Sequence, residues 1–202
     1  MASGQRQRTG RRPGSSGTRE AIAAAAKRRF AERGYERTTI RGIAEEAGVD
    51  PALVSHFFGS KQKLFLSVME LPFAPEEVMP EVLAGRRSQA GERLARFYVG
   101  MLEDPRSRSV ITGIVRAAAS EPDAARMARD LVAGRIVAAV SEALGVDDAR
   151  LRASLVGSQL IGLAMARYIV RVEPLASLSA DELVEAIAPN LQRYLTGPLE
   201  RR

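Results

Sequence analysis

Two short helical segments separated by one tight turn constrain this chain more than any other feature. A helix capped by Thr39 is ended by Gly48, a residue that tolerates the left-handed conformation at a helix end. Asp50 and Pro51 then begin a second short helix, since aspartate is a good cap and proline is tolerated at the first helical position. That helix must end before Gly59. Two short helices joined by a glycine-containing turn predict a helix-turn-helix unit.

Longer helices flank this unit. The preceding helix runs from a cap at Thr18 to about Arg33 and stops at Gly34, with Ile22, Ala26 and Phe30 on one face. The following helix runs from Lys61 towards Glu70, before Pro72 and Pro75. Further helices are expected at about 76–85, 90–103, 107–119, 122–144, 148–172 and 180–196, with no strand pattern. The predicted fold is therefore all-α, with a helix-turn-helix head and a C-terminal helical bundle.

The chain divides into three parts. Residues 1–17 are predicted to form a disordered basic arm, because Gly, Ser, Pro and Gln separate its arginines without apolar periodicity. Residues 18–66 form the head, and residues 67–202 form the body.

Charge is concentrated towards the N-terminus. Residues 1–67 carry 13 Lys and Arg against 6 Asp and Glu, whereas residues 68–202 carry 17 against 18. A basic head on a neutral body is typical of proteins that bind phosphate backbones. A solvated basic surface or attraction to a membrane surface remain alternatives. The basic run at 27–29 is expected to be a solvated face.

Several function classes are excluded by composition. The chain has no cysteine and one histidine, His56, which rules out disulfides, thiolate metal sites and metal sites that need two imidazoles. We therefore predict no metal and no cofactor. Enzymes that use carboxylates or lysine alone remain open. No apolar stretch long enough for a membrane span and no apolar signal core is expected, so a cytoplasmic location follows by default.

The second short helix has two distinct faces. Val54 and Phe58 fall together and are expected to pack inward. The opposite face is small or able to form hydrogen bonds and carries no acid, with Ala52, Leu53, Ser55 and His56. Such a face suits close approach to base edges in the major groove of DNA. The alternative for a lone histidine is a purely structural or exposed side chain.

Residues 18–65 resemble the TetR family of repressors. The resemblance rests on a Phe-x-x-x-Gly-Tyr helix end, a Thr-Thr-Ile start, an Ile-Ala-x-x-Ala-Gly-Val segment and a Phe-x-Ser-Lys junction. The matching residues are Phe30, Gly34, Tyr35, Thr38–Ile40, Ile43, Ala44, Ala47–Val49, Phe58, Ser60 and Lys61. The stretch 167–197 also looks like the end of one subgroup of the family. The sequence departs from the usual pattern at Gly42, where an acidic residue is frequent, and at Ser55–Phe57.

The resemblance implies roles in binding double-stranded DNA at a palindromic operator. Thr39 and Lys61 are expected to hold phosphates at helix N-termini. Arg41 is expected to contact a phosphate or a base edge. The outward face at 52–56 would contact bases, and the arm arginines would enter a neighbouring minor groove. The departures at 55–57 mean that the family's operator sequences do not transfer.

The resemblance also implies a homodimer. The helix at 148–172 is apolar almost all round and must be buried all round, either centrally in a monomeric bundle or, as in the family, between two copies. The expected dimer contacts are Leu160, Ile161, Leu183, Ile187, Leu191 and Tyr194. A pocket for a mostly hydrophobic small molecule is expected at Phe97, Tyr98, Met101, Ile114 and Met165, although such residues are also ordinary core.

The hypothesis that follows is a dimeric repressor released from its operator by a small molecule. Two alternatives remain from the sequence. One is a constitutive dimeric DNA-binding protein whose body serves only dimerisation. The other is a helical enzyme, which would require a cluster of titratable side chains that the sequence does not display at a recognisable spacing.

Overall fold

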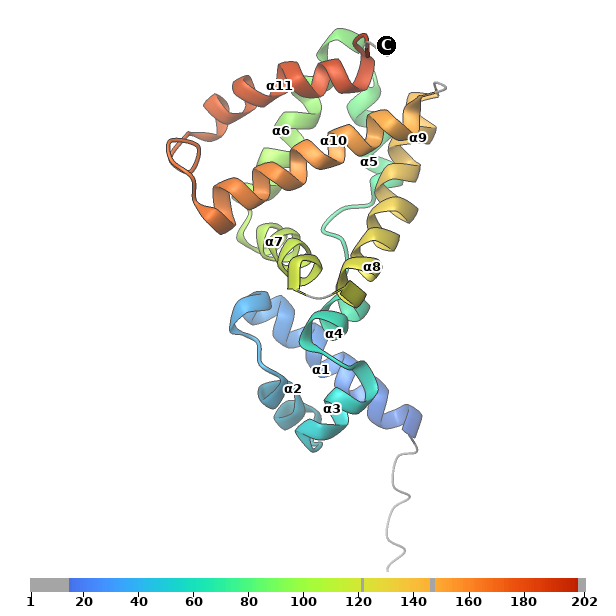
Figure 1. The fold of residues 1–202 in the computed structure, drawn as a ribbon, viewed down its shortest axis with the longest axis vertical. Helices are drawn as coiled ribbons and strands as arrows, with labels where there is room; N and C mark the ends of the chain where they lie inside the picture. The colour runs from blue at the N-terminus through green and yellow to red at the C-terminus, as the bar shows by residue number, and fades with distance from the viewer. Residues whose placement is uncertain (1–14, 121, 146–147, 200–202) are drawn as a thin grey trace, which may run out of the picture.

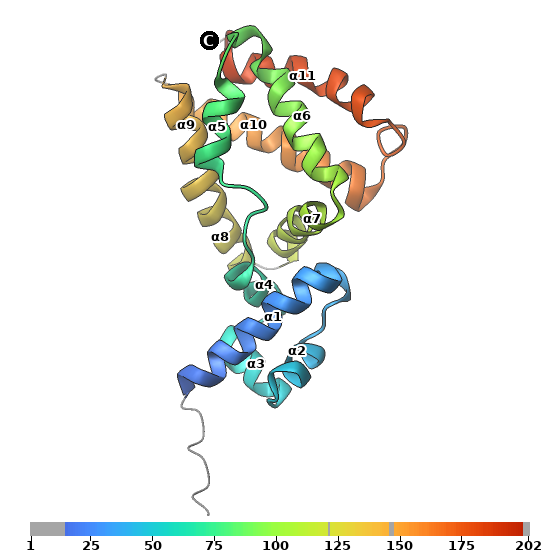
Figure 2. The same cartoon turned by 180° about the vertical axis from the view of Figure 1, so that it is seen from behind.

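The computed structural model describes residues 15–120, 122–145 and 148–199, and within these residues the fold is all helical (Figure 1). The head contains α1 (Ser15–Arg37), α2 (Ile40–Ala47), α3 (Pro51–Phe58) and α4 (Lys61–Val68). The body contains α5 (Pro75–Leu83), the 3₁₀ turn η1 (Arg87–Gln89), α6 (Ala90–Glu103), α7 (Pro105–Ser120), α8 (Pro122–Leu131), the π-helical turn η2 (Val132–Val137), α9 (Ala138–Leu144), α10 (Ala149–Ala164), the π-helical turn η3 (Met165–Val170) and α11 (Ala180–Thr196). Figures 1 and 2 show the head at one end of the molecule and the body at the other.

The helix bounds agree closely with the sequence analysis at several places. The predicted ranges of α6 and α11 are confirmed, as are the positions of α2 and α3. Helix α1 begins at Ser15, so residues 15–17 of the predicted arm are helical; residues 1–14 lie outside the described residues. Helix α4 ends at Val68 instead of Glu70. The two longest predicted helices each contain a π-helical turn, which an apolar period of 3.6 residues does not distinguish from α-helix.

A polar side chain caps the start of each short helix of the head. The Thr39 hydroxyl accepts a hydrogen bond from the Gly42 amide at 3.1 Å. The Asp50 carboxylate accepts one from the Ala52 amide at 2.8 Å, and Ser60 does the same at the start of α4. Each cap satisfies an amide that has no partner within its helix. Gly48 ends α2 in the left-handed conformation, with φ 67°, so the turn predicted from the sequence is present.

Three aromatic rings form the centre of the head. The Phe65 ring lies 5.0 Å from the ring of Phe30 and 5.0 Å from that of Tyr35, both in edge-to-face orientation. This is the arrangement that aromatic quadrupoles favour. Val54 of α3 is fully buried against the same core. The inward face predicted for the second short helix is therefore confirmed at Val54, while Phe58 is half-buried.

The end of α1 bends at Gly34, which has φ 74°. Thr38 is fully buried just beyond the bend, and its hydroxyl lies 2.8 Å from the Gly34 carbonyl and 3.1 Å from the Arg29 carbonyl. The hydroxyl thus donates to backbone carbonyl oxygen at the bend. The bend directs residues 35–37 towards the body.

The head and body meet where α7 crosses α1 and α4. Gly113 of α7 lies so close to the head core that an added Cβ would be 2.8 Å from the Phe65 ring and 3.1 Å from Cβ of Tyr35. An ion pair of 3.1 Å joins Arg116 to Glu36 across the junction. A second joins Lys63 of α4 to Asp123 of α8. Close packing and charged contacts such as these therefore attach the head to the body.

Helices α6 and α11 pack together in the body core. Gly91 permits this close approach, and its amide donates to the side-chain carbonyl of Gln192 at 2.8 Å. Helix α11 begins with a complete capping box between Ser179 and Glu182. Its apolar side faces α6 and belongs to the core of the same chain.

Candidate nucleic-acid interface

The outward face of α3 is exposed as the sequence predicts. Ala52, Ser55 and His56 are exposed, and Leu53 is a large apolar side chain with 38% of its surface accessible. The His56 ring makes an edge contact with Phe57 on the same helix, with centroids 5.3 Å apart. Val54 anchors α3 to the head from the other side. The helix therefore presents two hydrogen-bonding side chains and two apolar ones outward, with no carboxylate among residues 51–58.

The start of α2 lies in the same head. Thr39 and Arg41 are both exposed. The Thr39 oxygen accepts from the Gly42 amide, and its hydroxyl proton can still be donated to another oxygen. A helix N-terminus and a nearby guanidinium favour an anion. Contact of these residues with a phosphate stays a prediction.

Lys61 differs from the expectation of a free phosphate-binding lysine. Its ammonium lies 4.4 Å from the centre of the Tyr35 ring and donates to the Glu36 carbonyl at 3.4 Å. Burial lowers the pKa of Lys61, and the nearby Glu36 carboxylate partly offsets that effect. The sequence alone did not indicate this intramolecular position, because Tyr35 and Lys61 are brought together only by the packing of α1 and α4.

Two arginines of α1 form ion pairs within the head. Arg28 and Arg29 each donate to the Glu46 carboxylate of α2 at 2.8 Å. The hydrogen bond from Arg28 is the main cause that lowers the pKa of Glu46. The expectation of a solvated face at 27–29 is wrong for Arg29, whose side chain is only 15% exposed. The Arg29 guanidinium also lies where a side chain at Gly42 would project.

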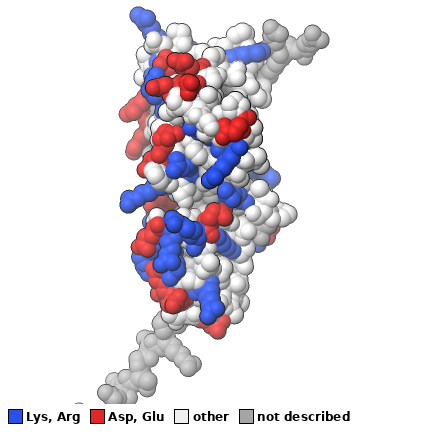
Figure 3. Space-filling view, turned by 90° about the vertical axis from the view of Figure 1, so that its left-hand side faces the viewer, with Lys and Arg blue, Asp and Glu red and all other residues white. Residues whose placement is uncertain are grey.

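The basic residues do not form one uniform surface. Figure 3 shows lysine and arginine side chains interleaved with acidic ones on the face it presents. One basic group that sequence reasoning missed is Arg19, whose guanidinium lies 5.3 Å from the ring centre of Phe58 at the end of α3. It brings a positive charge beside the outward helix. Only the spacing between α1 and α3 in the fold reveals this proximity.

The residues predicted to line a hydrophobic pocket do not converge. Tyr98 and Met101 belong to the body core, with the Tyr98 hydroxyl donating to the Leu160 carbonyl at 2.9 Å. Ile114 instead packs against the head core, and Phe97 pairs with the Phe73 ring. Met165 is exposed. The predicted pocket is therefore wrong as a single site, because these side chains lie in different surroundings.

The predicted dimer residues divide into two groups. Leu183, Ile187 and Leu191 are wrong as surface contacts, because they are buried against α6 within their own chain. Leu160 and Tyr194 are half-buried, and Ile161 is 43% exposed. An amphipathic pattern shows that α11 has an apolar side, but not whether that side meets its own chain or another.

Helix α10 and its continuation η3 leave much apolar surface uncovered. The span Ala149–Val170 has a mean hydropathy of 1.4 over an 18-residue window, of which only 22% is buried in the chain. By length and composition it meets the requirements of a membrane span, where the sequence analysis expected none. Leu151, Ile161 and Met165 are exposed along it.

Two family profiles match this chain. A family profile described as "Bacterial regulatory proteins, tetR family" matches residues 22–68. A second profile, "Tetracyclin repressor-like, C-terminal domain", matches residues 88–195. Together they cover the helix-turn-helix head and most of the body.

Individual relatives agree with these profiles. The HTH-type transcriptional repressor AcnR of Corynebacterium efficiens is 39% identical over 97 residues, which are 48% of this chain and 46% of that protein. The match thus spans less than half the length of that relative. The HTH-type transcriptional regulator BetI of Brucella anthropi is 31% identical over 176 residues, which cover 83% of this chain and 89% of the relative.

A solved structure matches almost end to end. The crystal structure of a TetR-family regulator from Streptomyces coelicolor is 39% identical, covers 93% of this chain and 99% of its own, and superimposes with a TM-score of 0.53. This agreement extends over both the head and the body. The chain is therefore a member of the TetR family of bacterial regulatory proteins.

Proposed function

We propose that this protein is a transcriptional repressor that binds a palindromic double-stranded DNA operator as a homodimer. The observation that carries the proposal is the exposed, acid-free face of α3, held outward by the fully buried Val54. The relatives named above as a transcriptional repressor and a transcriptional regulator support it. A regulator of this kind works in the cytoplasm, where the DNA is.

Recognition is divided between the two exposed helices. Ser55 and His56 supply hydrogen bonds to base edges in the major groove, and Ala52 and Leu53 supply apolar contacts to thymine methyl groups. Thr39, Arg41 and the first amides of α2 position the head on the phosphate backbone. The bases are therefore read by α3, while α2 determines where α3 lies.

The dimer is formed through the outward face of α10. Exposed apolar side chains at Leu151, Ile161 and Met165 alternate with small residues at Ser158 and Gly162, which let another helix approach closely. Burying this face against a second copy removes the apolar area from water. We propose this copy, instead of a membrane, as the partner of the span Ala149–Val170. A two-fold dimer would then place two heads on half-sites about 34–36 Å apart.

The proposal is tested by selecting bound sequences from random duplex DNA with the full-length protein. A repressor of this kind enriches an inverted repeat whose half-sites are separated by about one helical turn. Placed upstream of a reporter gene, that sequence should lower expression only when the protein is present. Enrichment of no sequence would refute operator recognition, and activation of the reporter would refute repression.

Release by a small molecule is the second part of the proposal. The support is a pair of cavities at the junction of head and body, where a bound molecule would touch both parts. Without such a molecule the protein would be a constitutive dimeric DNA-binding protein. The ligand-released repressor and the constitutive protein are distinguished by whether any compound that binds the protein also changes its affinity for the operator.

A further inference from the structure

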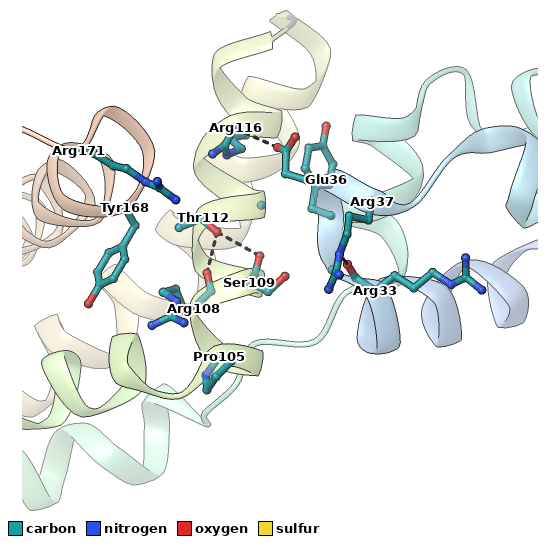
Figure 4. Close-up of a pocket in the computed structure, with 13 residues that line it drawn as sticks. Arg33, Glu36, Arg37, Pro105, Arg108, Ser109, Thr112, Arg116, Tyr168 and Arg171 are labelled. Atoms are coloured by element: carbon teal, nitrogen blue, oxygen red, sulfur yellow. Dashed lines mark hydrogen bonds and ion pairs between the residues drawn. The ribbon is translucent and has the colours of Figure 1, made fainter. Parts of the chain in front are cut away.

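The cleft at the junction of head and body has an unusual lining. It has a volume of about 570 Å³ and is formed by residues 33–37 at the end of α1, by α7 and by residues at the end of η3. Figure 4 shows these three segments facing one another across the opening. The segments are far apart in the sequence, so the cleft exists only in the folded chain. Any molecule bound there contacts the head and the body at once.

Arginines dominate this lining. Among the residues that the structure describes, five arginines border the cleft, against a single carboxylate, that of Glu36. Figure 4 shows the Arg33 side chain extending away, while Arg37, Arg108, Arg116 and Arg171 surround the opening. Guanidinium groups around one cleft repel one another, and an anion bound among them offsets that repulsion.

Most of these guanidinium groups retain free donors. Arg116 pairs with Glu36, but among the described residues no carboxylate forms an ion pair with Arg37, Arg108 or Arg171. Arg37 donates through Nε to the Arg33 carbonyl. Arg108 donates to the Leu102 carbonyl and lies over the Tyr168 ring at 5.3 Å. The remaining N–H groups of these forks are available to an acidic ligand.

The backbone at the cleft is shaped to present these groups. Gly34 bends the end of α1 at φ 74° and so sets the position of Arg37. Arg171 ends η3 with φ 61°, a left-handed conformation that residues other than glycine rarely adopt. Ser109 and Thr112 of α7 add hydroxyl groups to the lining between Arg37 and Arg171. The wall is thus polar and basic, unlike the apolar pocket expected from the sequence.

From this arrangement we propose that the cleft binds a small molecule with at least two acidic groups and that this molecule couples the cleft to DNA binding. Planar guanidinium forks match carboxylate and phosphate oxygens equally well. One acidic group would lie between Arg108 and Arg171 of the body, and another would reach Arg37 of the head. The ligand acts on DNA binding because it favours one placement of the head relative to the body.

Binding is measured first, without DNA, by titration calorimetry at constant ionic strength. The probes are inorganic pyrophosphate and propane-1,2,3-tricarboxylate, with acetate as the singly charged comparison. Saturable binding of one or both probes, one per chain, is the expected result, and the stronger probe identifies the acid type. If neither probe saturates at millimolar concentration, or if acetate binds as well, the site is refuted.

Substitutions locate the site. Arg37→Gln and Arg171→Gln each remove a charge-assisted hydrogen bond and should weaken probe binding by about tenfold or more. Arg106→Gln removes the same charge from an exposed side chain at the start of α7 that does not border the cleft, and should change binding much less. Equal losses in all three variants would mean general attraction to basic protein, which overturns the proposal. Circular dichroism of each variant shows whether it is folded.

The coupling between the cleft and DNA binding rests on the proposed DNA-binding function and is measured separately. Operator affinity with and without saturating probe should change by a factor equal to the change that operator causes in probe affinity, about 5–150-fold in known cases. A probe that binds the free protein but leaves operator affinity unchanged refutes the coupling alone. If Arg37→Gln and Arg171→Gln instead weaken operator binding without any probe, the cleft contacts DNA phosphates and the small-molecule site is refuted.

Discussion

His56 is the residue whose substitution tests base recognition most directly. Its imidazole is exposed on α3 on the side opposite the buried Val54. We expect His56→Ala to change the preferred base at one position in each half-site, because a lost base contact alters discrimination by about 1–3 kcal/mol at that position. Selection from random DNA measures the change. Asn190→Ala on α11 is the control, and an unaltered sequence preference for His56→Ala would show that the imidazole does not contact bases.

Lys61 is predicted to contact a phosphate and also packs beside Tyr35, and two substitutions separate these roles. Lys61→Met keeps an apolar stem beside Tyr35 but removes the charge, whereas Lys61→Ala removes both. If the ammonium contacts a phosphate, both variants weaken binding to all sequences alike and reduce the salt slope by about one unit. We expect only Lys61→Ala to lose about 1 kcal/mol of stability as well, from lost packing.

Salt-dependent binding assays and thermal unfolding separate these outcomes. A salt slope that is unchanged in both Lys61 variants would assign the lysine a structural role only, through its contacts with Tyr35 and Glu36.

At the scale of elements, the contact of α7 with the head depends on Gly113. An added methyl group would meet the Phe65 ring and Tyr35, both of which are buried. Overpacking costs about 1–3 kcal/mol, whereas replacing a helical glycine by alanine gains about 1 kcal/mol. We expect the packing cost to prevail, so that Gly113→Ala lowers the free energy of unfolding.

Gly100 of α6 provides the matched control. It is exposed, and an added Cβ there meets no atom within 4 Å. Gly100→Ala should therefore raise the free energy of unfolding by about 0.5–1 kcal/mol. Denaturant unfolding compares the two variants. Equal stabilisation by both substitutions would show that α7 is free to move away from the head without cost.

At the scale of the whole molecule, the proposed dimer depends on the outward face of α10. Ile161→Glu would place a carboxylate in an apolar interface, at a cost of several kcal/mol that dissociation avoids. Because Ile161 is partly exposed in the single chain, the protomer itself should stay folded. Analytical ultracentrifugation should therefore find dimers of the wild type and folded monomers of the variant.

Leu53→Glu, which changes an exposed apolar residue of the head, should leave the dimer intact. A wild-type chain that sediments as a monomer at micromolar concentration would contradict both the proposed dimer and the two-fold operator. It would leave the fold and the head unaffected, since neither depends on a second copy.

Features that arise from local hydrogen bonds can be predicted from the amino-acid sequence alone. Caps at Thr39 and Asp50 join groups only two or three residues apart, so their partners are visible in the sequence. The same holds for the capping box at Ser179 and for the glycine turn at Gly48. Periodicity likewise predicted which side of α3 is buried, because a helix repeats its faces every few residues.

Which surfaces face one another depends on long-range packing, which local sequence patterns do not show. The apolar side of α11 packs within its own chain, and two arginines of α1 form ion pairs with a carboxylate of α2. The basic cleft likewise combines Arg37, Arg108 and Arg171, which no local pattern connects. An amphipathic pattern indicates that a side chain must be buried or paired, but the packing of the whole fold determines its partner.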